Sequence, residues 1–120
     1  MLQEYEQQNG IRLFLSSDQS FPELSGNYNH YKCFIVLSSK LVRHRPDGVF
    51  GFLHDVGTFE NKNDPGLRKY LYPRLKRLYR FVNQLRLFRD LQNEQRYELS
   101  VYGSKPSQRI EFEAIFTLFH

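Results

Sequence analysis

Hydrophobic and polar positions predict one central strand near the middle of the chain. Residues 49–53, with the sequence VFGFL, form an unbroken apolar run. The run is too short for a helix, and it lacks the alternation of a half-exposed strand. It therefore predicts a strand buried on both faces, which is typical of parallel sheets.

A loop and a helix are expected after this strand. Residues 57–66 are rich in asparagine, glycine, aspartate and proline, which favour turns. Apolar residues then recur at spacings of four and three, which predicts an amphipathic helix over residues 67–85. They are Leu67, Leu71, Leu75, Leu78, Val82 and Leu85. Pro73 lies inside this pattern and would kink the helix or, after a short turn, begin a second one.

The flanking segments predict one more helix and two strands. Apolar positions between Tyr31 and Val42 fit a helix packed on a sheet, with Asn29 as its N-cap. Residues 97–102 alternate between apolar and polar, which predicts a half-buried strand. A second alternation begins at Ile110 and runs into a terminal apolar stretch.

These patterns predict a single partial α/β domain over residues 1–120, since this length is at most one domain. We expect a loop-rich segment over residues 1–28, an αβα unit over residues 29–88 and strands over residues 89–120. The chain ends inside an apolar run, whose side chains need something to pack against, so we expect the sheet to be incomplete.

Composition narrows the class of protein. Apolar residues make up 40% and charged residues 25% of the chain, as in a globular protein. The single cysteine excludes an internal disulfide and a cysteine cluster for zinc, and it fits a reducing cytoplasm. The four histidines lack metal-ligand spacing, so we expect no metal. No apolar run is long enough to cross a membrane, and none marks an export signal.

Positive charge is concentrated in residues 67–90, which hold eight cations against the single Asp90, while the rest of the chain holds nine basic and twelve acidic residues. A basic helix of this kind predicts contacts with the phosphates of DNA. A solvated outer helix face is the alternative. The candidate phosphate contacts are Arg68, Lys69, Arg74, Lys76, Arg77 and Arg80.

The end of the central strand carries the candidate site chemistry. His54 and Asp55 follow the apolar run, at the carboxyl end of the strand, where open α/β sheets place ligand groups. The alternative is that both side chains only satisfy nearby backbone groups. Asp55 with Glu60 and Lys62 could be the acid and the Glu-x-Lys of a metal-dependent nuclease. The two parts of such a site are normally on separate strands, and the four residues between Asp55 and Glu60 leave too little chain for that.

Three segments together resemble the large adenine-N6 DNA methyltransferases of restriction-modification and phage-defence (BREX/DISARM-like) systems. They are PELSGNYNHYKCFIVLSSKL at residues 22–41, DGVFGFLHDVGTFENKNDPGLRKYLYPRLKRLYRFVNQLRLF at residues 47–88 and RYELSVYG at residues 96–103. Their order and spacing match the family over roughly two-thirds of the chain. The sequence departs at His30, where a leucine is usual, and at Asp55, which replaces the proline after the histidine.

The resemblance implies the later strands of a Rossmann-like methyltransferase sheet, a parallel strand plus an antiparallel hairpin with flanking helices. It implies S-adenosylmethionine as cofactor and an adenine of DNA as substrate in the complete enzyme. His54, Asp55 and Thr58 would then form a wall of the active site. The glycine-rich cofactor loop and the Asn/Asp-Pro-Pro-aromatic motif have no counterpart here, since no two prolines are adjacent.

From these missing motifs we expect no catalytic residue in this chain, no binding of S-adenosylmethionine to it alone, and a partner that supplies the N-terminal half of the methyltransferase. The alternative is a non-catalytic basic module that binds nucleic acid or docks to a partner protein.

Overall fold

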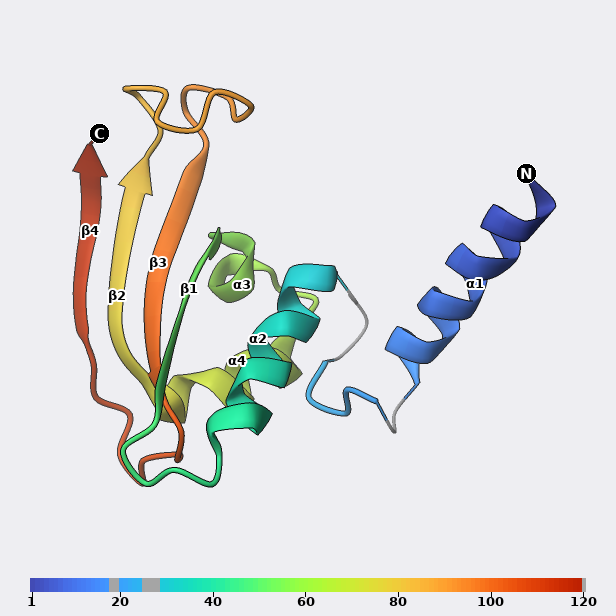
Figure 1. Ribbon diagram of the computed structural model, residues 1–120. Helices are drawn as coiled ribbons and strands as arrows, with labels where there is room; N and C mark the ends of the chain where they lie inside the picture. The colour runs from blue at the N-terminus through green and yellow to red at the C-terminus, as the bar shows by residue number, and fades with distance from the viewer. Residues whose placement is uncertain (18–19, 25–28, 120) are drawn as a thin grey trace.

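The computed structural model describes residues 1–17, 20–24 and 29–119 and has a mixed α/β fold (Figure 1). Its elements in chain order are α1 (Leu2–Ser16), α2 (His30–Val42), β1 (Val49–Asp55), α3 (Gly57–Glu60), α4 (Pro65–Leu71), a 3-10 helix (Tyr72–Arg74), β2 (Leu75–Val82), β3 (Arg96–Gly103) and β4 (Glu113–Phe119). The strands form one open sheet in the order β1-β3-β2-β4. β3 runs antiparallel to β1 and β2, whereas β2 and β4 are parallel. The sheet is therefore mixed, with β1 and β4 at its edges.

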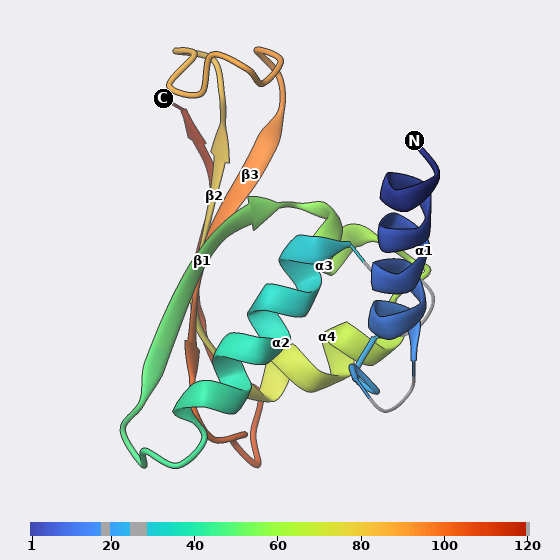
Figure 2. The ribbon, with the colours of Figure 1, turned by 45° about the vertical axis from the view of Figure 1, so that its right-hand side comes forward.

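The core lies between the sheet and helices on one of its faces. α2, α3 and α4 are on the same side of the sheet (Figure 2). The buried apolar side chains of this layer are Leu24, Cys33, Ile35, Val36, Phe50, Leu67, Leu71, Leu75, Leu78 and Tyr102. A buried ion pair adds to them, because Lys32 Nζ of α2 lies 2.9 Å from a carboxylate oxygen of Asp64, just before α4. Apolar burial holds the helices on the sheet, and this pair joins α2 to the start of α4.

The other face of the sheet is open. Val49 and Leu53 of β1 are 64% and 47% exposed, and Leu99 lies opposite Leu53 in the strand register. Ile115 of β4 is exposed on the same face. No helix that the structure describes lies on this side of the sheet (Figure 2). We call the surface formed by Val49, Leu53, Leu99 and Ile115 the open face.

Several predicted elements are confirmed. α2 begins directly after Asn29, whose extended backbone fits an N-cap position. The alternating residues 97–102 lie in β3, and the terminal apolar run lies in β4. None of the described helices is both long enough and apolar enough to span a membrane.

The predicted surroundings of β1 are wrong. β1 is an edge strand with an antiparallel neighbour, not a strand buried on both faces of a parallel sheet. Phe50 and His54 are buried against the helices, whereas Val49 and Leu53 face outward. An unbroken apolar run shows that both faces of a strand are apolar, but it does not supply the second covering layer.

The predicted helix over residues 67–85 is also wrong beyond its first turns. α4 ends at Leu71, and the chain after Pro73 forms β2. Leu75 and Leu78 are both buried although they are three residues apart, because the register of β2 against β3 shifts after Leu75. Such a bulge lets positions three apart share one face of a strand and so imitates helical spacing. The basic helix that we predicted is therefore largely a strand.

Two loop predictions need correction as well. Residues 57–66 contain α3 and the start of α4, with Pro65 at the first helical position. In the segment 1–28, residues 2–16 form α1, which is rich in the helix formers glutamine and glutamate. α1 stands away from the sheet in both views (Figures 1 and 2). Residues 18–19 and 25–28 of the predicted loop lie outside the described residues.

Candidate functional site

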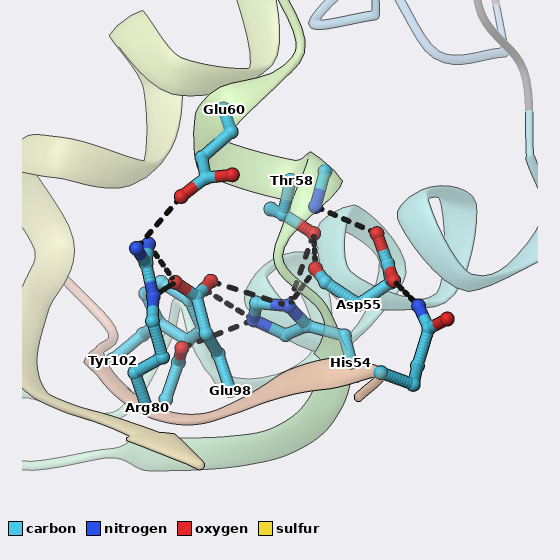
Figure 3. Close-up of polar contacts among 10 residues, drawn as sticks. His54, Asp55, Thr58, Glu60, Arg80, Glu98 and Tyr102 are labelled. Atoms are coloured by element: carbon cyan, nitrogen blue, oxygen red, sulfur yellow. Dashed lines mark hydrogen bonds and ion pairs between the residues drawn. The ribbon is translucent and has the colours of Figure 1, made fainter. Parts of the chain in front are cut away.

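Two of the three predicted wall residues meet at the carboxyl end of β1 (Figure 3). His54 of β1 and Thr58 of α3 are both buried, and Thr58 Oγ1 lies 3.0 Å from His54 Nδ1. Both side chains also reach the backbone carbonyl oxygen of Asp55, at 2.9 Å from His54 Nδ1 and 3.2 Å from Thr58 Oγ1. The end of β1 and the start of α3 are thus held together by one buried hydrogen-bond network.

The carboxylate of Asp55 has other partners. Its Oδ1 accepts a hydrogen bond of 2.7 Å from the backbone N–H of Gly57, and its Oδ2 accepts one of 2.7 Å from Gln95 Nε2. Asp55 therefore ties β1 to the segment just before β3.

β3 supplies the partners of His54 that sequence reasoning missed. His54 Nε2 lies 3.0 Å from Ser100 Oγ and 3.3 Å from the hydroxyl oxygen of Tyr102. Both residues are buried on the helix-covered face of the sheet. The alternation of residues 97–102 contained the signal, but here the polar set faces inward, while Leu99 faces outward.

An ion-pair chain extends the network across the sheet. Glu98 lies opposite His54 in the register and is fully buried. Its Oε1 accepts from Arg80 Nε at 2.9 Å and from Arg80 Nη2 at 2.5 Å. Arg80 Nη1 donates to Glu60 Oε1 at 2.7 Å (Figure 3). We call the following group the His54 cluster: His54, Thr58, Glu60, Arg80, Glu98, Ser100 and Tyr102.

Burial sets the protonation states in this cluster. It lowers the pKa of His54, although the Asp55 carbonyl and carboxylate oppose the effect, so the imidazole is neutral at pH 7. Because a carbonyl oxygen only accepts, Nδ1 of His54 carries the proton and Nε2 accepts from the hydroxyl groups. Burial also raises the pKa of Tyr102, which keeps its hydroxyl proton, and that of Glu98, against the pull of Arg80.

One oxygen of Glu98 is left without a hydrogen bond. Among the described residues, its buried Oε2 has no hydrogen-bond partner, and it lies 3.9 Å from His54 Nδ1. The cluster is therefore held on one side by Arg80 and is under-satisfied on the other, which makes it sensitive to any change at Arg80.

A pocket of about 210 Å³ opens beside the end of β1. Its apolar lining comes from Leu53, Phe88, Leu91 and Tyr97, and its polar lining from His54, Asp55, Gln95 and Arg96. The loop over the pocket, residues 83–95, is organised by buried Asn83, whose Nδ2 donates to Phe88 O at 2.9 Å and whose Oδ1 accepts from Phe88 N at 3.3 Å. An apolar lining with a few polar groups is the usual form of a small-ligand site, so this pocket is a candidate place for a ligand.

The six predicted phosphate contacts do not form one basic surface. Arg80 is 18% exposed and is held by two carboxylates. Arg74 lies over the ring of Tyr70, with its guanidinium carbon 3.9 Å from the ring centre. Arg77 of β2 pairs with Glu113 at 3.4 Å. The other three lie on two elements, Arg68 and Lys69 on α4 and Lys76 on β2.

The turn after β1 has no glycine-rich loop, and the amide of Gly57 that opens α3 already donates to Asp55. Within the described part of the chain, no group of three or more histidine, cysteine, aspartate or glutamate residues could hold a metal ion.

We compared the chain with known proteins. No protein family, no curated protein and no solved structure matches this chain.

Proposed function

We propose that this chain is a later part of the catalytic core of an adenine-N6 DNA methyltransferase and is inactive by itself. The observation that carries the proposal is the course of the first three strands. β3 lies between β1 and β2 and is antiparallel to both, so β1 and β2 run in the same direction. The sequence resemblance implies a strand followed by an antiparallel hairpin at the end of a Rossmann-like sheet, and this arrangement is compatible with it.

The free edge of β1 supports the same proposal. β1 has a neighbour on one side only, and Val49 and Leu53 beside this edge are exposed. An unprotected edge strand with an apolar face is a template for a further strand and a further covering layer. An N-terminal half that carries the cofactor loop would add a strand along β1 and helices over the open face.

The His54 cluster then has a positioning role. It fixes the carboxyl end of β1, where open α/β sheets bind ligands, and the neighbouring pocket would form part of the wall around the substrate. The target adenine must leave the DNA stack to be reached, because its amino group is paired inside the duplex. The cofactor and the groups that hold the adenine amino group would come from the other half, so we assign no catalytic residue here.

The test begins with the DNA immediately upstream of the Met1 codon, translated in all three forward frames. We expect a frame with a glycine-rich turn and an Asn/Asp-Pro-Pro-aromatic motif. Co-expression of that segment with this chain should give a complex that binds S-adenosylmethionine in calorimetry and transfers its methyl group to adenine in DNA. This chain alone should do neither. The absence of such a frame, or a complex that does not bind the cofactor, would count against the proposal.

A matched pair of variants tests the docking surface. Leu53→Glu places a charge on the open face and should abolish complex formation with the upstream segment. Ile110→Glu is the control, because Ile110 is also exposed but lies in the loop before β4, the strand at the opposite edge of the sheet. Equal effects of the two variants would remove the open face from the proposal.

A non-catalytic module that binds nucleic acid is the second candidate. The observation that favours it is a set of exposed cations at the amino-terminal end of β1, away from His54, among them Arg43, Arg45 and Lys105. The two candidates differ in one result: only a methyltransferase part gains S-adenosylmethionine binding when an upstream half is added.

A further inference from the structure

We propose that a rim of cations at the amino-terminal end of β1 binds the phosphate backbone of nucleic acid. We call it the basic rim, and its members are Arg43, Arg45, Lys76, Lys105 and Arg109. All five are exposed. They come from three parts of the chain: the turn between α2 and β1, the start of β2, and the loop after β3.

Buried hydrogen bonds bring these parts together. Ser104 is buried, its Oγ donates to the carbonyl oxygen of Arg45 at 2.7 Å, and its backbone N–H donates to the carbonyl oxygen of Gly48 at 2.8 Å. The loop before β1 is thus fixed against the loop after β3. The side chain of Lys76 crosses the end of β3, since its Cε lies 2.9 Å from where a Cβ on Gly103 would be. The rim is therefore a built surface and not a chance grouping along the sequence.

In the described part of the chain, the rim forms no ion pairs with carboxylates, although Lys76 lines one hollow together with Glu111 and Glu113. Among the residues that the structure describes, no carboxylate lies within 4.0 Å of any of its five cations. The acidic residues in the same loops are Asp47 and Glu111, so five positive and two negative charges leave an excess of three. The whole chain has a net charge of +4. The rim and its two loops therefore carry a local net charge of +3.

The rim is a different set of cations from the one predicted from the sequence. In the segment we predicted to bind phosphates, Arg80 and Arg77 are paired with carboxylates. The rim draws only Lys76 from that segment. Three arginines and two lysines spread over two loops and a strand start suit a line of phosphates, which guanidinium groups bind with two parallel hydrogen bonds.

The choice of nucleic acid as the polyanion rests on the proposed function. The existence of the basic rim does not rest on it, because the rim follows from the structure alone. β1 has seven residues, and at about 3.3 Å per residue it separates the rim from His54 by roughly 20 Å. Binding at the rim is therefore a contact separate from methyl transfer. It would hold DNA outside the reaction site and add affinity without reading sequence.

The experiment measures binding of a 20-base-pair DNA duplex by fluorescence anisotropy over a series of salt concentrations. The rim variant is Arg45→Gln, Lys105→Gln and Arg109→Gln, three exposed side chains whose loss leaves the Ser104 hydrogen bonds intact. The control variant is Arg12→Gln, Lys62→Gln and Lys69→Gln, which removes the same charge from exposed positions elsewhere. Circular dichroism melts of both variants check that the fold is unchanged.

We expect the rim variant to flatten the plot of log affinity against log salt by about 2.7, which corresponds to three lost phosphate contacts. Its affinity at 0.1 M salt should fall by more than tenfold, and the control should fall by less than threefold. Equal losses in the two variants, or no duplex binding by the unchanged chain at low salt, would overturn the proposal.

A parallel arm with anionic phospholipid vesicles decides the source of the phosphates. If the rim variant loses vesicle binding and keeps duplex binding, nucleic acid is the wrong partner. Failure of this experiment is distinguishable from failure of the proposed function, because the rim is tested on this chain alone and methyl transfer only on the complex with an upstream half.

Discussion

Replacing Arg80 by methionine tests whether the buried Glu98 depends on a single partner. Arg80 makes both hydrogen bonds to Glu98 Oε1, and it lies between Glu98 and Glu60. Methionine keeps much of the apolar stem of the side chain and removes the charge. In the variant, both oxygens of the fully buried Glu98 carboxylate lack the bonds to Arg80, and Oε2 has no hydrogen-bond partner even in the original chain.

The expected cost follows from that burial. Removing one partner of a buried ion pair costs about 3–5 kcal/mol, because it strands an uncompensated charge. Arg80 itself is 18% exposed, so we take the lower end, about 3 kcal/mol. For a chain of 120 residues this corresponds to a fall in melting temperature of about 12 °C.

Thermal and urea denaturation followed by circular dichroism measure the effect. The matched control is Arg77→Met on the same strand, since Arg77 is 58% exposed and its partner Glu113 is 77% exposed. Exposed pairs of this kind are worth less than about 1 kcal/mol. If Arg80→Met lowers the free energy of unfolding no more than Arg77→Met does, Arg80 does not compensate the buried charge of Glu98.

Acid should partly rescue the Arg80→Met variant. Burial raises the pKa of Glu98 and Arg80 lowers it, so without Arg80 the folded state binds a proton that the unfolded state releases. The difference in stability between the variant and the original chain should shrink as the pH falls from 7 toward the ordinary range of a glutamate. Adding Glu98→Gln should also recover part of the loss at pH 7, and a double variant as unstable as the sum of both single changes would refute this account.

Three further predictions concern other parts of the chain. Burial lowers the pKa of His54, so the folded state binds fewer protons than the unfolded state, and the free energy of unfolding should fall as the pH drops from 7.5 to 5.5. His54→Gln should show a smaller fall. The same pH profile in this variant and in the original chain would contradict the prediction. Asn83→Ala removes both hydrogen bonds to Phe88 and should lower the free energy of unfolding by about 2 kcal/mol, because buried groups lose their partners. It should also speed tryptic cleavage of the loop over residues 83–95. Unchanged cleavage would mean that Asn83 does not organise this loop. Leu53→Glu combined with Leu99→Lys places opposite charges at facing positions of the open face. The double variant should self-associate less in light scattering, and its melting temperature should change by only a few degrees. A loss of folding would show that the core needs these side chains.

Sequence reasoning was most successful where one local signal settles the structure. The extent of α2 follows from its apolar spacing and from Asn29, which begins it. β2 was missed because a bulge placed Leu75 and Leu78 on one face, and only pairing with β3 reveals a bulge. The charge pattern was correct as composition, but it could not show that Arg80 turns inward to Glu98.

The candidate site was predicted only in part for the same reason. His54 and Thr58 are four residues apart, so their contact is local and follows from the turn after β1. Ser100 and Tyr102 reach His54 across 46 and 48 residues of sequence, and their contacts depend on the register between β1 and β3. A strand whose polar side faces the core cannot be recognised by alternation alone, because alternation gives two faces and does not say which is inside.

The open face has a consequence for how much of this chain a cell retains. Exposed apolar strands are recognised by chaperones and proteases, which remove chains that lack cover. Val49 and Leu53 lie beside the free edge of β1, where an added layer would hide them. We therefore expect the abundance of this chain in a cell to follow the supply of whatever covers the open face.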